Sequence, residues 1–445
     1  EKGLLPELYK SRGFWIAFIA IAALHSMNML AQYMPDRVPA IPLTLDITGI
    51  FTQPPLVYIP GTFFKTPIYF IFIAMGFFMP FRMGFSIWFF SLAYALYSAL
   101  GRTYVPNFSA LTVNDHRTGA MLVLTAYVIW LGRAHWMMVV KSMFFRLKGD
   151  AAFRDALSGW LFVIGCVGMI GWMLWFGVGV WALFYLFMGF MITVLIMRFL
   201  AETGTPFIKV EPAARMGMDV LPMSWLSAVP VYFNAFFAIF TMYGTRSCFP
   251  AFALQALALP KNMSEKARSR LLIGLIAIAL SGVVICGAVH LISAYRFTPF
   301  MGGSDSLTWG KGVLDNAQRD LISFEKGTYT KSVTHNRPLH LAAGAVLTGV
   351  LQWLCVTFPA WPLHPIGIIL ALTFFGNMSW LSILIGWAVK GLVVRFGGSR
   401  LLRSAKPFFL GLIAGEAVII IVWAAVAASL AFAGLPYEKV LLQPY

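Results

Sequence analysis

The chain has 445 residues, of which 60% are hydrophobic and only 11% are charged. Soluble domains carry about 25% charged residues, so this composition excludes a fold that faces water on all sides. The net charge of +16 would suggest nucleic-acid binding in a soluble protein, but here Lys and Arg lie in short loops between apolar runs. That distribution is typical of membrane proteins, and we predict an all-α, polytopic integral membrane protein that contacts lipid and no nucleic acid.

Apolar runs of membrane-helix length follow one another along the whole chain. Because backbone amides cannot stay unpaired in hydrocarbon, runs of about 20 residues should be helices. We expect one membrane domain over residues 1–445 with about eleven membrane segments, some of them broken or re-entrant. In chain order, these are residues 14–32, 66–80, 81–101, 118–140, 157–176, 177–200, 222–243, 271–293, 340–358, 365–389 and 407–433.

The basic loops predict an orientation. Lys and Arg crowd residues 141–154 and 390–406, and the six expected segments between these loops allow both to be cytoplasmic. Counting back from them places residues 1–12 on the cytoplasmic side and the C-terminus outside.

The basic loop 261–270 disagrees with this orientation. Either the segment 222–243 or the stretch 246–260 is re-entrant, or the charge bias is weak there. We favour re-entrance, because Pro222, Pro230 and Pro250 interrupt the region.

A pattern within the long loop 295–338 predicts a further helix. Trp309, Val313, Ala317 and Leu321 recur every four residues, with charged residues on the other faces. This periodicity indicates an amphipathic helix that lies either at the membrane interface or packed on the protein surface.

Glu416 is the clearest ionisable residue inside an apolar segment. Charged groups there are costly unless they are paired or hydrated, so they often mark ion or substrate pathways. Glu416 could bind and release a proton during transport, or it could be a structural partner for a cation such as Lys390. The spacing of Gly411 and Gly415 on the same segment indicates close packing against another helix.

Other polar residues in the apolar segments have two interpretations. Asn234 with Tyr232, and Asn377 with Ser379 and Trp380, could line a substrate path or form hydrogen bonds between helices. We interpret the membrane histidines as core or interface residues, because neither has the paired partner that haem ligation requires. These histidines are His25 and His290.

Helix breaks are the second functional signal, since half-helix ends direct dipoles and free backbone groups into cavities at transporter sites. Trp361 to Gly367, with His364 before Pro365, opens the tenth segment, and Gly376-Asn377 interrupts it.

Signals for catalysis and metal binding are absent from the sequence. The four cysteines are far apart, without a C-x-x-C pair, and indicate neither a disulfide framework nor a thiolate metal site. The common hydrolase, metalloprotease, P-loop and dinucleotide motifs do not occur. We therefore expect no enzymatic activity and no cofactor.

Several motifs together resemble an uncharacterised bacterial membrane protein family that is similar to the oligopeptide transporter superfamily. The motifs are WPLHPIG at 361–367, GWAVK at 386–390, RFGG at 395–398, PFFLG at 407–411 with GE at 415–416, FSIWFF at 85–90, AETGTP at 201–206 and YGTR at 243–246. The resemblance implies a multi-helix transporter fold in the bacterial inner membrane. It also brings Glu202, His364 and Arg246 among the candidates for a substrate or proton pathway.

The leading hypothesis is a secondary transporter, or the larger part of one, for a small organic solute such as a peptide or metal chelate, with proton coupling. Related proteins usually carry further helices upstream, and this chain begins with Glu1 rather than Met. We therefore expect the upstream part to be missing or to be a separate membrane chain. The alternative hypothesis is a membrane-embedded structural or anchoring subunit of a larger complex.

Overall fold

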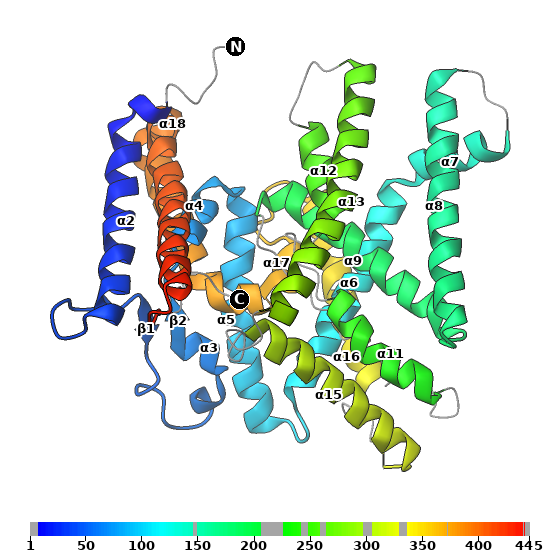
Figure 1. The fold of residues 1–445 in the computed structure, drawn as a ribbon, viewed down its shortest axis with the longest axis horizontal. Coiled ribbons are helices and arrows are strands. Elements are labelled where there is room, and N and C mark those ends of the chain that lie inside the picture. Colours follow the sequence, from blue (N-terminus) through cyan, green and yellow to red (C-terminus); the bar gives the residue numbers. More distant parts are fainter. Residues whose placement is uncertain are drawn as a thin grey trace. The chain divides into compact units, whose positions relative to one another are not determined.

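A computed structural model describes residues 8–145, 149–205, 226–241, 248–258, 264–296, 305–328, 336–371, 373–438 and 440. The regular structure in these ranges is almost entirely helical (Figure 1), which confirms the all-α prediction. A small antiparallel sheet of β1 (Thr44–Asp46) and β2 (Lys65–Pro67) was not predicted. The chain divides into two compact units: residues 1–108, 202–205 and 351–445 form unit 1, and residues 109–201 and 206–350 form unit 2.

Unit 1 contains a long N-terminal helix, several short helices and a long bent helix at the C-terminus. Its elements are α2 (Arg12–Tyr33), η1 (Leu56–Tyr58), α3 (Gly61–Phe64), α4 (Phe70–Phe78), α5 (Phe81–Tyr104), α17 (Pro365–Ala371) and α18 (Phe374–Phe432), with the ends of α9 and α16. Unit 2 consists of α6 (Ala110–Leu131), α7 (Arg133–Phe144), α8 (Asp150–Trp175), α9 (Trp181–Thr203), α11 (Ala228–Thr241), α12 (Phe249–Ala258), α13 (Glu265–Arg296), α15 (Asp305–Glu325) and α16 (Arg337–Thr357).

Seven helices among the described residues are long and apolar enough to cross a membrane, or eight if the bent pair α6–α7 is one span. The count of about eleven segments stays a prediction. Two helices are shorter than the apolar runs suggest: α4, in the expected second segment, has nine residues, and α17, at the start of the expected tenth, has seven. At 1.5 Å per residue, neither approaches the roughly 30 Å of a hydrocarbon core.

α18 consists of two helical arms, residues 374–397 and 399–432, joined at Gly398. The expectation of a loop at residues 390–406 was therefore wrong, because this basic segment is helical on both sides of Gly398. The φ of +58° and ψ of −156° at Gly398 lie in a region of backbone conformation open essentially only to glycine. The bend therefore depends on the second glycine of the RFGG motif. It allows both arms of α18 to contact the short helix α4.

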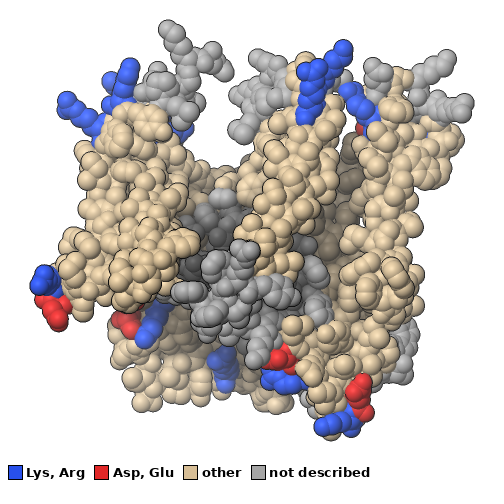
Figure 2. Space-filling view, viewed as in Figure 1, with Lys and Arg blue, Asp and Glu red and all other residues tan. Residues whose placement is uncertain are grey.

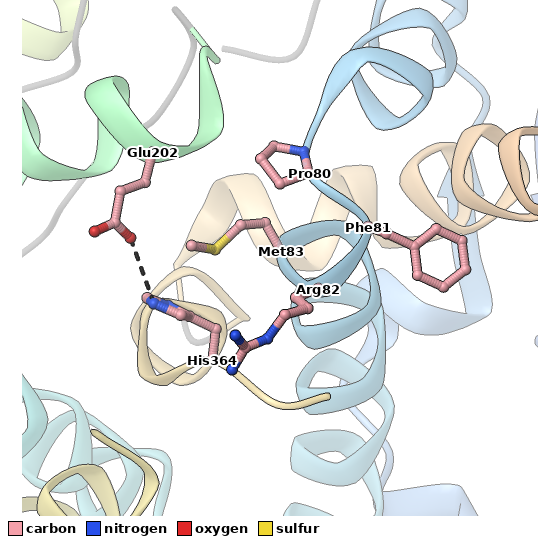
Figure 3. A pocket seen from close by; sticks show the side chains of 6 residues that line it. All are labelled: Pro80, Phe81, Arg82, Met83, Glu202 and His364. Carbon is pink, nitrogen blue, oxygen red and sulfur yellow. Dashed lines mark ion pairs between the residues drawn. The ribbon is translucent and has the colours of Figure 1, made fainter. Parts of the chain in front are cut away.

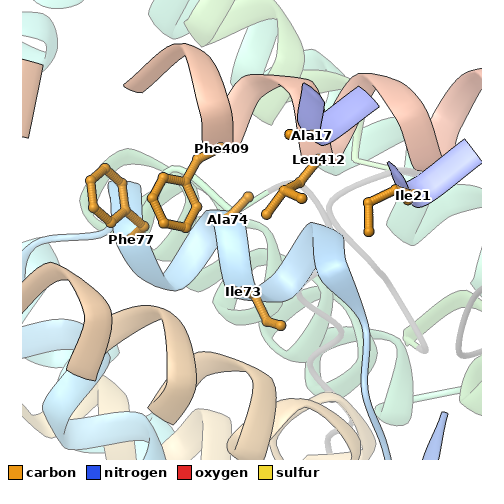
Figure 4. Close-up of a cluster of buried hydrophobic side chains, with 7 residues drawn as sticks. All are labelled: Ala17, Ile21, Ile73, Ala74, Phe77, Phe409 and Leu412. Atoms are coloured by element: carbon orange, nitrogen blue, oxygen red, sulfur yellow. The ribbon is translucent and has the colours of Figure 1, made fainter. Parts of the chain in front are cut away.

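α4 is buried where α2 and α18 meet it. Figure 4 shows the apolar cluster at this place, with Phe77 stacked on Phe409 at a centroid distance of 3.8 Å. On the other arm of α18, a Cβ on Gly386 would lie 2.1 Å from the carbonyl oxygen of Ile73. The missing side chain at Gly386 thus permits backbone contact between α4 and α18.

α2 runs along the second arm of α18 (Figure 1), and small residues make this contact close. A Cβ on Gly411 would lie 2.3 Å from the carbonyl oxygen of Phe14, and one on Gly415 would lie 2.7 Å from that of Phe18. The packing face predicted from the Gly411/Gly415 spacing is therefore confirmed.

The expected tenth segment is broken, but the predicted position of the break was wrong. The sequence predicted an interruption at Gly376-Asn377, whereas the structure breaks the helix between α17 and α18, at Thr373. The Thr373 hydroxyl caps α18 by accepting a hydrogen bond from the N–H of Gly376 (3.3 Å). A Cβ on Gly376 would lie 2.2 Å from the carbonyl oxygen of Leu370, so this glycine permits the chain to fold back instead of ending the helix.

In unit 2, the helix predicted within the loop 295–338 is confirmed as α15. It packs on α11, and Ala317 of the predicted stripe is fully buried. α11 and α12 lie in the region expected to be re-entrant and have 14 and 10 residues, too few for a span each. The residues between them lie outside the described ranges.

α13 differs from every other candidate span. None of the residues in its most apolar window is buried within the structure. On the face shown in Figure 2, charged side chains lie near the ends of the helices and uncharged side chains cover most of their length. Individual helices with charged ends and an uncharged length between them are of the kind that could span a membrane.

Candidate functional site

A pocket of about 400 Å³ lies in unit 1 (Figure 3). The start of α5, the last turn of α9 and the residue before α17 contribute its walls. The lining residues are Pro80, Phe81, Arg82, Met83, Glu202 and His364. Three of these six side chains can carry a charge, and the other three are apolar.

Backbone contacts orient His364. Its Nδ1 accepts a hydrogen bond from the N–H of Ile366 (3.3 Å), and its own N–H donates to the Ser86 hydroxyl (2.7 Å). Because Nδ1 acts as an acceptor, the ring proton lies on Nε2. That nitrogen is 3.5 Å from Oε2 of Glu202. The histidine therefore presents a protonated nitrogen to a carboxylate at the pocket wall.

Arg82 is a pocket residue that the sequence analysis missed. Its Nη2 donates to the Cys355 sulfur (3.3 Å), which in turn donates to the carbonyl oxygen of Leu363 (3.0 Å). The buried Nε of Arg82 has no hydrogen-bond partner in the described structure. A basic residue two positions after Pro80, in the first turn of an apolar segment, was the available signal.

Glu416 lies elsewhere in unit 1 and is 1% exposed. Its Oε2 accepts a hydrogen bond from the N–H of Ile71 (2.6 Å), in the first turn of α4. Its Oε1 lies 3.9 Å from Nε2 of His25. Since first-turn N–H groups have no intrahelical partner, Glu416 caps α4.

The suggested pairing of Glu416 with Lys390 is not what the structure shows. The Lys390 ammonium instead donates to the carbonyl oxygen of Met79 (2.6 Å), directly after α4. α18 therefore places a carboxylate at the N-terminus of α4 and a cation at its C-terminus. Both charges have the sign that stabilises a helix dipole.

The remaining candidates do not join the pocket. Asn377 lies in the first turn of α18, and its buried Oδ1 has no hydrogen-bond partner in the described structure. Asn234 and the half-buried Tyr232 lie on α11 in unit 2. Arg246 lies outside the described residues. Of the seven candidates, the structure thus brings Glu202 and His364 together at one cavity.

A buried polar cluster in unit 2 was also missed. Asp115 of α6 and Arg337 of α16 form an ion pair at 2.9 Å, and one turn away His340 Nδ1 lies 3.2 Å from His116 Nε2. The sequence analysis placed the start of the fourth segment at residue 118, so the acidic residue appeared to lie in a loop. α6 begins eight residues earlier, at Ala110.

These features define a helical protein with several helices that could span a membrane and a charged pocket beside two short helices. The chain belongs to the Family of unknown function (DUF6785), whose profile matches residues 1–437. No curated protein and no solved structure matches the chain. The comparisons show no link to the oligopeptide transporter superfamily. In the described part of the chain, no group of three or more His, Cys, Asp or Glu could hold a metal ion.

Proposed function

We propose that the protein is a multi-pass transporter of the bacterial cytoplasmic membrane, similar to the oligopeptide transporter superfamily. It moves a small organic solute such as a peptide or metal chelate, with proton coupling. The observation that carries the proposal is the pocket in which Arg82, Glu202 and His364 meet beside short helices. Charged residues at such places in membrane proteins commonly mark substrate and proton pathways.

Exposed apolar helices support the membrane location. The apolar window of α13 has no buried residue and that of α8 is 11% buried. Surfaces of this kind greatly exceed the patches that monomeric soluble proteins leave in water. Exposed apolar surfaces of this kind are stable in the hydrocarbon of a lipid bilayer.

The short helices support transport. α4 and α17 end inside unit 1 instead of continuing as full-length spans, and the pocket lies at the junction of α4 with α5 and at the start of α17. Discontinuous helices form substrate sites in transporters because their ends supply dipoles and free backbone groups at membrane depth. Glu202 and His364 are the groups that would carry the coupling proton.

Contacts along α2 support the proposed orientation. At one end of α2, Gly13 lies next to Phe408, which follows the basic segment 390–406 of α18. At the other end, the Tyr33 hydroxyl accepts a hydrogen bond from the N–H of Glu438 (3.0 Å). The start of α2 and the basic segment of α18 therefore share one side of unit 1, which we propose is cytoplasmic, and residue 438 lies at the opposite end of α2.

Uptake by purified protein in liposomes tests the proposal. Under an inward proton gradient, we expect accumulation of radiolabelled dipeptides or a ferric chelate that collapses with a protonophore. Glu202→Gln should abolish the gradient-driven uptake, while Asp36→Asn, at an exposed loop carboxylate, should leave it intact. The absence of driven uptake for every solute of both classes would contradict transport.

The exposed apolar surfaces of α13 and α8 favour a second candidate, a membrane-embedded structural or anchoring subunit whose partner chain covers these helices. Gentle extraction from native membrane, with crosslinking from cysteines placed on α13, separates the two functions. A stoichiometric protein partner crosslinked to α13 would support the structural role. Crosslinking to lipid alone would support the transporter.

A further inference from the structure

We propose that the pocket in unit 1 binds a solute through a carboxylate group, and that Arg82 is the residue that holds it. This inference uses the pocket of the proposed function and adds the chemical class of its ligand. A binding measurement tests this inference, whether or not the ligand is then transported.

Among the described residues, the hydrogen bonds of Arg82 include none to an anionic group. A guanidinium group has five N–H donors and is always protonated. Here Nη2 donates to a neutral thiol, a weak acceptor, and the buried Nε has no partner in the described structure. Structural arginines in apolar surroundings are normally paired with a carboxylate, because an unpaired buried charge is costly. An anionic ligand would supply the missing partner.

The acidic residue in the pocket is already engaged. Oε2 of Glu202 lies 3.5 Å from Nε2 of His364, whose orientation is fixed by the N–H of Ile366. Figure 3 shows the Glu202 carboxylate on the far side of the His364 ring from the Arg82 guanidinium. The pocket therefore presents a paired carboxylate on one side and an arginine without a carboxylate partner on the other.

Two further features fit a carboxylate. Arg82 belongs to the first turn of the 24-residue α5, where the helix dipole adds positive potential to that of the side chain. A planar guanidinium also matches a carboxylate in two-point geometry better than an ammonium group would. The apolar wall of Pro80, Phe81 and Met83 can contact the uncharged remainder of the ligand, and about 400 Å³ is enough for a small solute.

Thermal unfolding of purified protein in detergent tests the inference with defined probes. Acetate, butyrate and benzoate should raise Tm at constant ionic strength, and their isosteric amides should bind at least tenfold more weakly. Arg82→Gln should remove the carboxylate response, and Arg82→Lys should retain part of it. Arg102→Gln, an exposed arginine near the other end of α5, is the matched control and should behave as the wild-type protein.

A ligand-binding arginine and a structural arginine differ without ligand. Because its charge lacks a carboxylate partner, Arg82→Gln should leave the Tm of the unliganded protein unchanged or higher. Unfolding of this variant, equal binding of amides and carboxylates, or no carboxylate response in the wild-type protein would overturn the inference. Carboxylate binding without driven uptake would contradict transport alone, and driven uptake of neutral solutes without carboxylate binding would contradict this inference alone.

Discussion

Two pairs of a glutamate and a histidine lie among the described residues of unit 1, and they differ in burial and in the groups that surround them. In the first, Glu416 and His25 are 3.9 Å apart with side-chain exposures of 1% and 4%. In the second, Glu202 and His364 are 3.5 Å apart with side-chain exposures of 16% and 15%, at the wall of a pocket.

The partners of each pair explain the difference. Glu416 accepts a backbone N–H that would otherwise be unsatisfied at the start of α4, so its carboxylate has a structural task. The ring of His364 is held at Nδ1 by the backbone N–H of Ile366, and its Nε2 lies 3.5 Å from Glu202 at the pocket wall. A carboxylate within an apolar run therefore does not identify a transport residue by itself, because the groups that surround it decide its role.

The largest expected effect comes from separating α2 from α18, which would dismantle the first pair. In Gly411→Val, the new Cβ would meet the carbonyl oxygen of Phe14 at 2.3 Å, and backbone cannot move as a side-chain end can. We expect a loss of about 3 kcal/mol or more, at the upper end of overpacking effects, measured by thermal unfolding in detergent.

Gly282→Val on α13 is the matched control, since its Cβ would meet no atom within 4 Å. It should unfold as the wild-type protein does. Equal Tm values for both valine variants would contradict the close packing of α2 on α18.

The next effect distinguishes the two glutamates directly. Glu416→Ala removes the acceptor of the buried Ile71 N–H, and an unsatisfied buried donor costs about 1–3 kcal/mol. Glu416→Gln should cost less, because its side-chain oxygen can still accept. Both variants are measured by thermal unfolding.

The same changes at Glu202 should show the reverse pattern. Glu202→Gln should change the free energy of unfolding by less than about 1 kcal/mol, as is usual for partly exposed positions. It should nevertheless impair proton-driven uptake. If Glu416→Ala left Tm unchanged and abolished uptake while folding normally, the roles assigned to the two glutamates would be reversed.

A smaller effect is expected at His25. Neither of its ring nitrogens has a hydrogen-bond partner in the described structure, although the side chain is buried. Replacing a buried polar group by an apolar one of similar size can be neutral or stabilising. We therefore expect His25→Leu to keep or raise Tm. A clear decrease would show that the contact with Glu416 stabilises the fold as an ion pair.

Features that depend on local pattern were predictable from the sequence. The apolar periodicity predicted a helix within residues 295–338, which the structure shows as α15, and the Gly411/Gly415 spacing predicted the close contact with α2. The short length of α4 and the helix break at Thr373 were not predictable from local pattern. Hydropathy continues through them, and the helix ends are set by capping groups from Glu416 and Thr373 that hydropathy does not measure.

The candidate site was only partly predictable, because its residues come from elements that are far apart in the sequence. Glu202 and His364 were named through motifs, but their meeting joins the end of α9 to the start of α17, far apart in the sequence. Arg82 was missed because a basic residue at a segment start is expected at a membrane boundary anyway. Its significance comes from having a thiol where a carboxylate would be expected.

The smallest effect concerns an exposed carboxylate that serves as a reference for both pairs. Asp46 accepts hydrogen bonds from the Thr48 hydroxyl (2.6 Å) and backbone N–H (3.0 Å), and the ammonium of Lys65 on the paired strand is 3.3 Å away. These contacts, with the Thr48 hydroxyl first, lower the pKa of the Asp46 carboxyl below its usual value. A lowered folded-state pKa contributes stability that is present above the unfolded-state pKa of about 3.9 and is lost as pH falls through the folded-state pKa.

Asp46→Asn should therefore unfold at a slightly lower temperature than the wild-type protein at pH 7, and the difference should shrink toward zero as pH falls below about 3.9. Because the site is exposed, the difference should also decrease with added salt, whereas that of Glu416→Ala should not. A difference that grew on acidification would mean that the sheet of β1 and β2 stabilises the protonated form of Asp46.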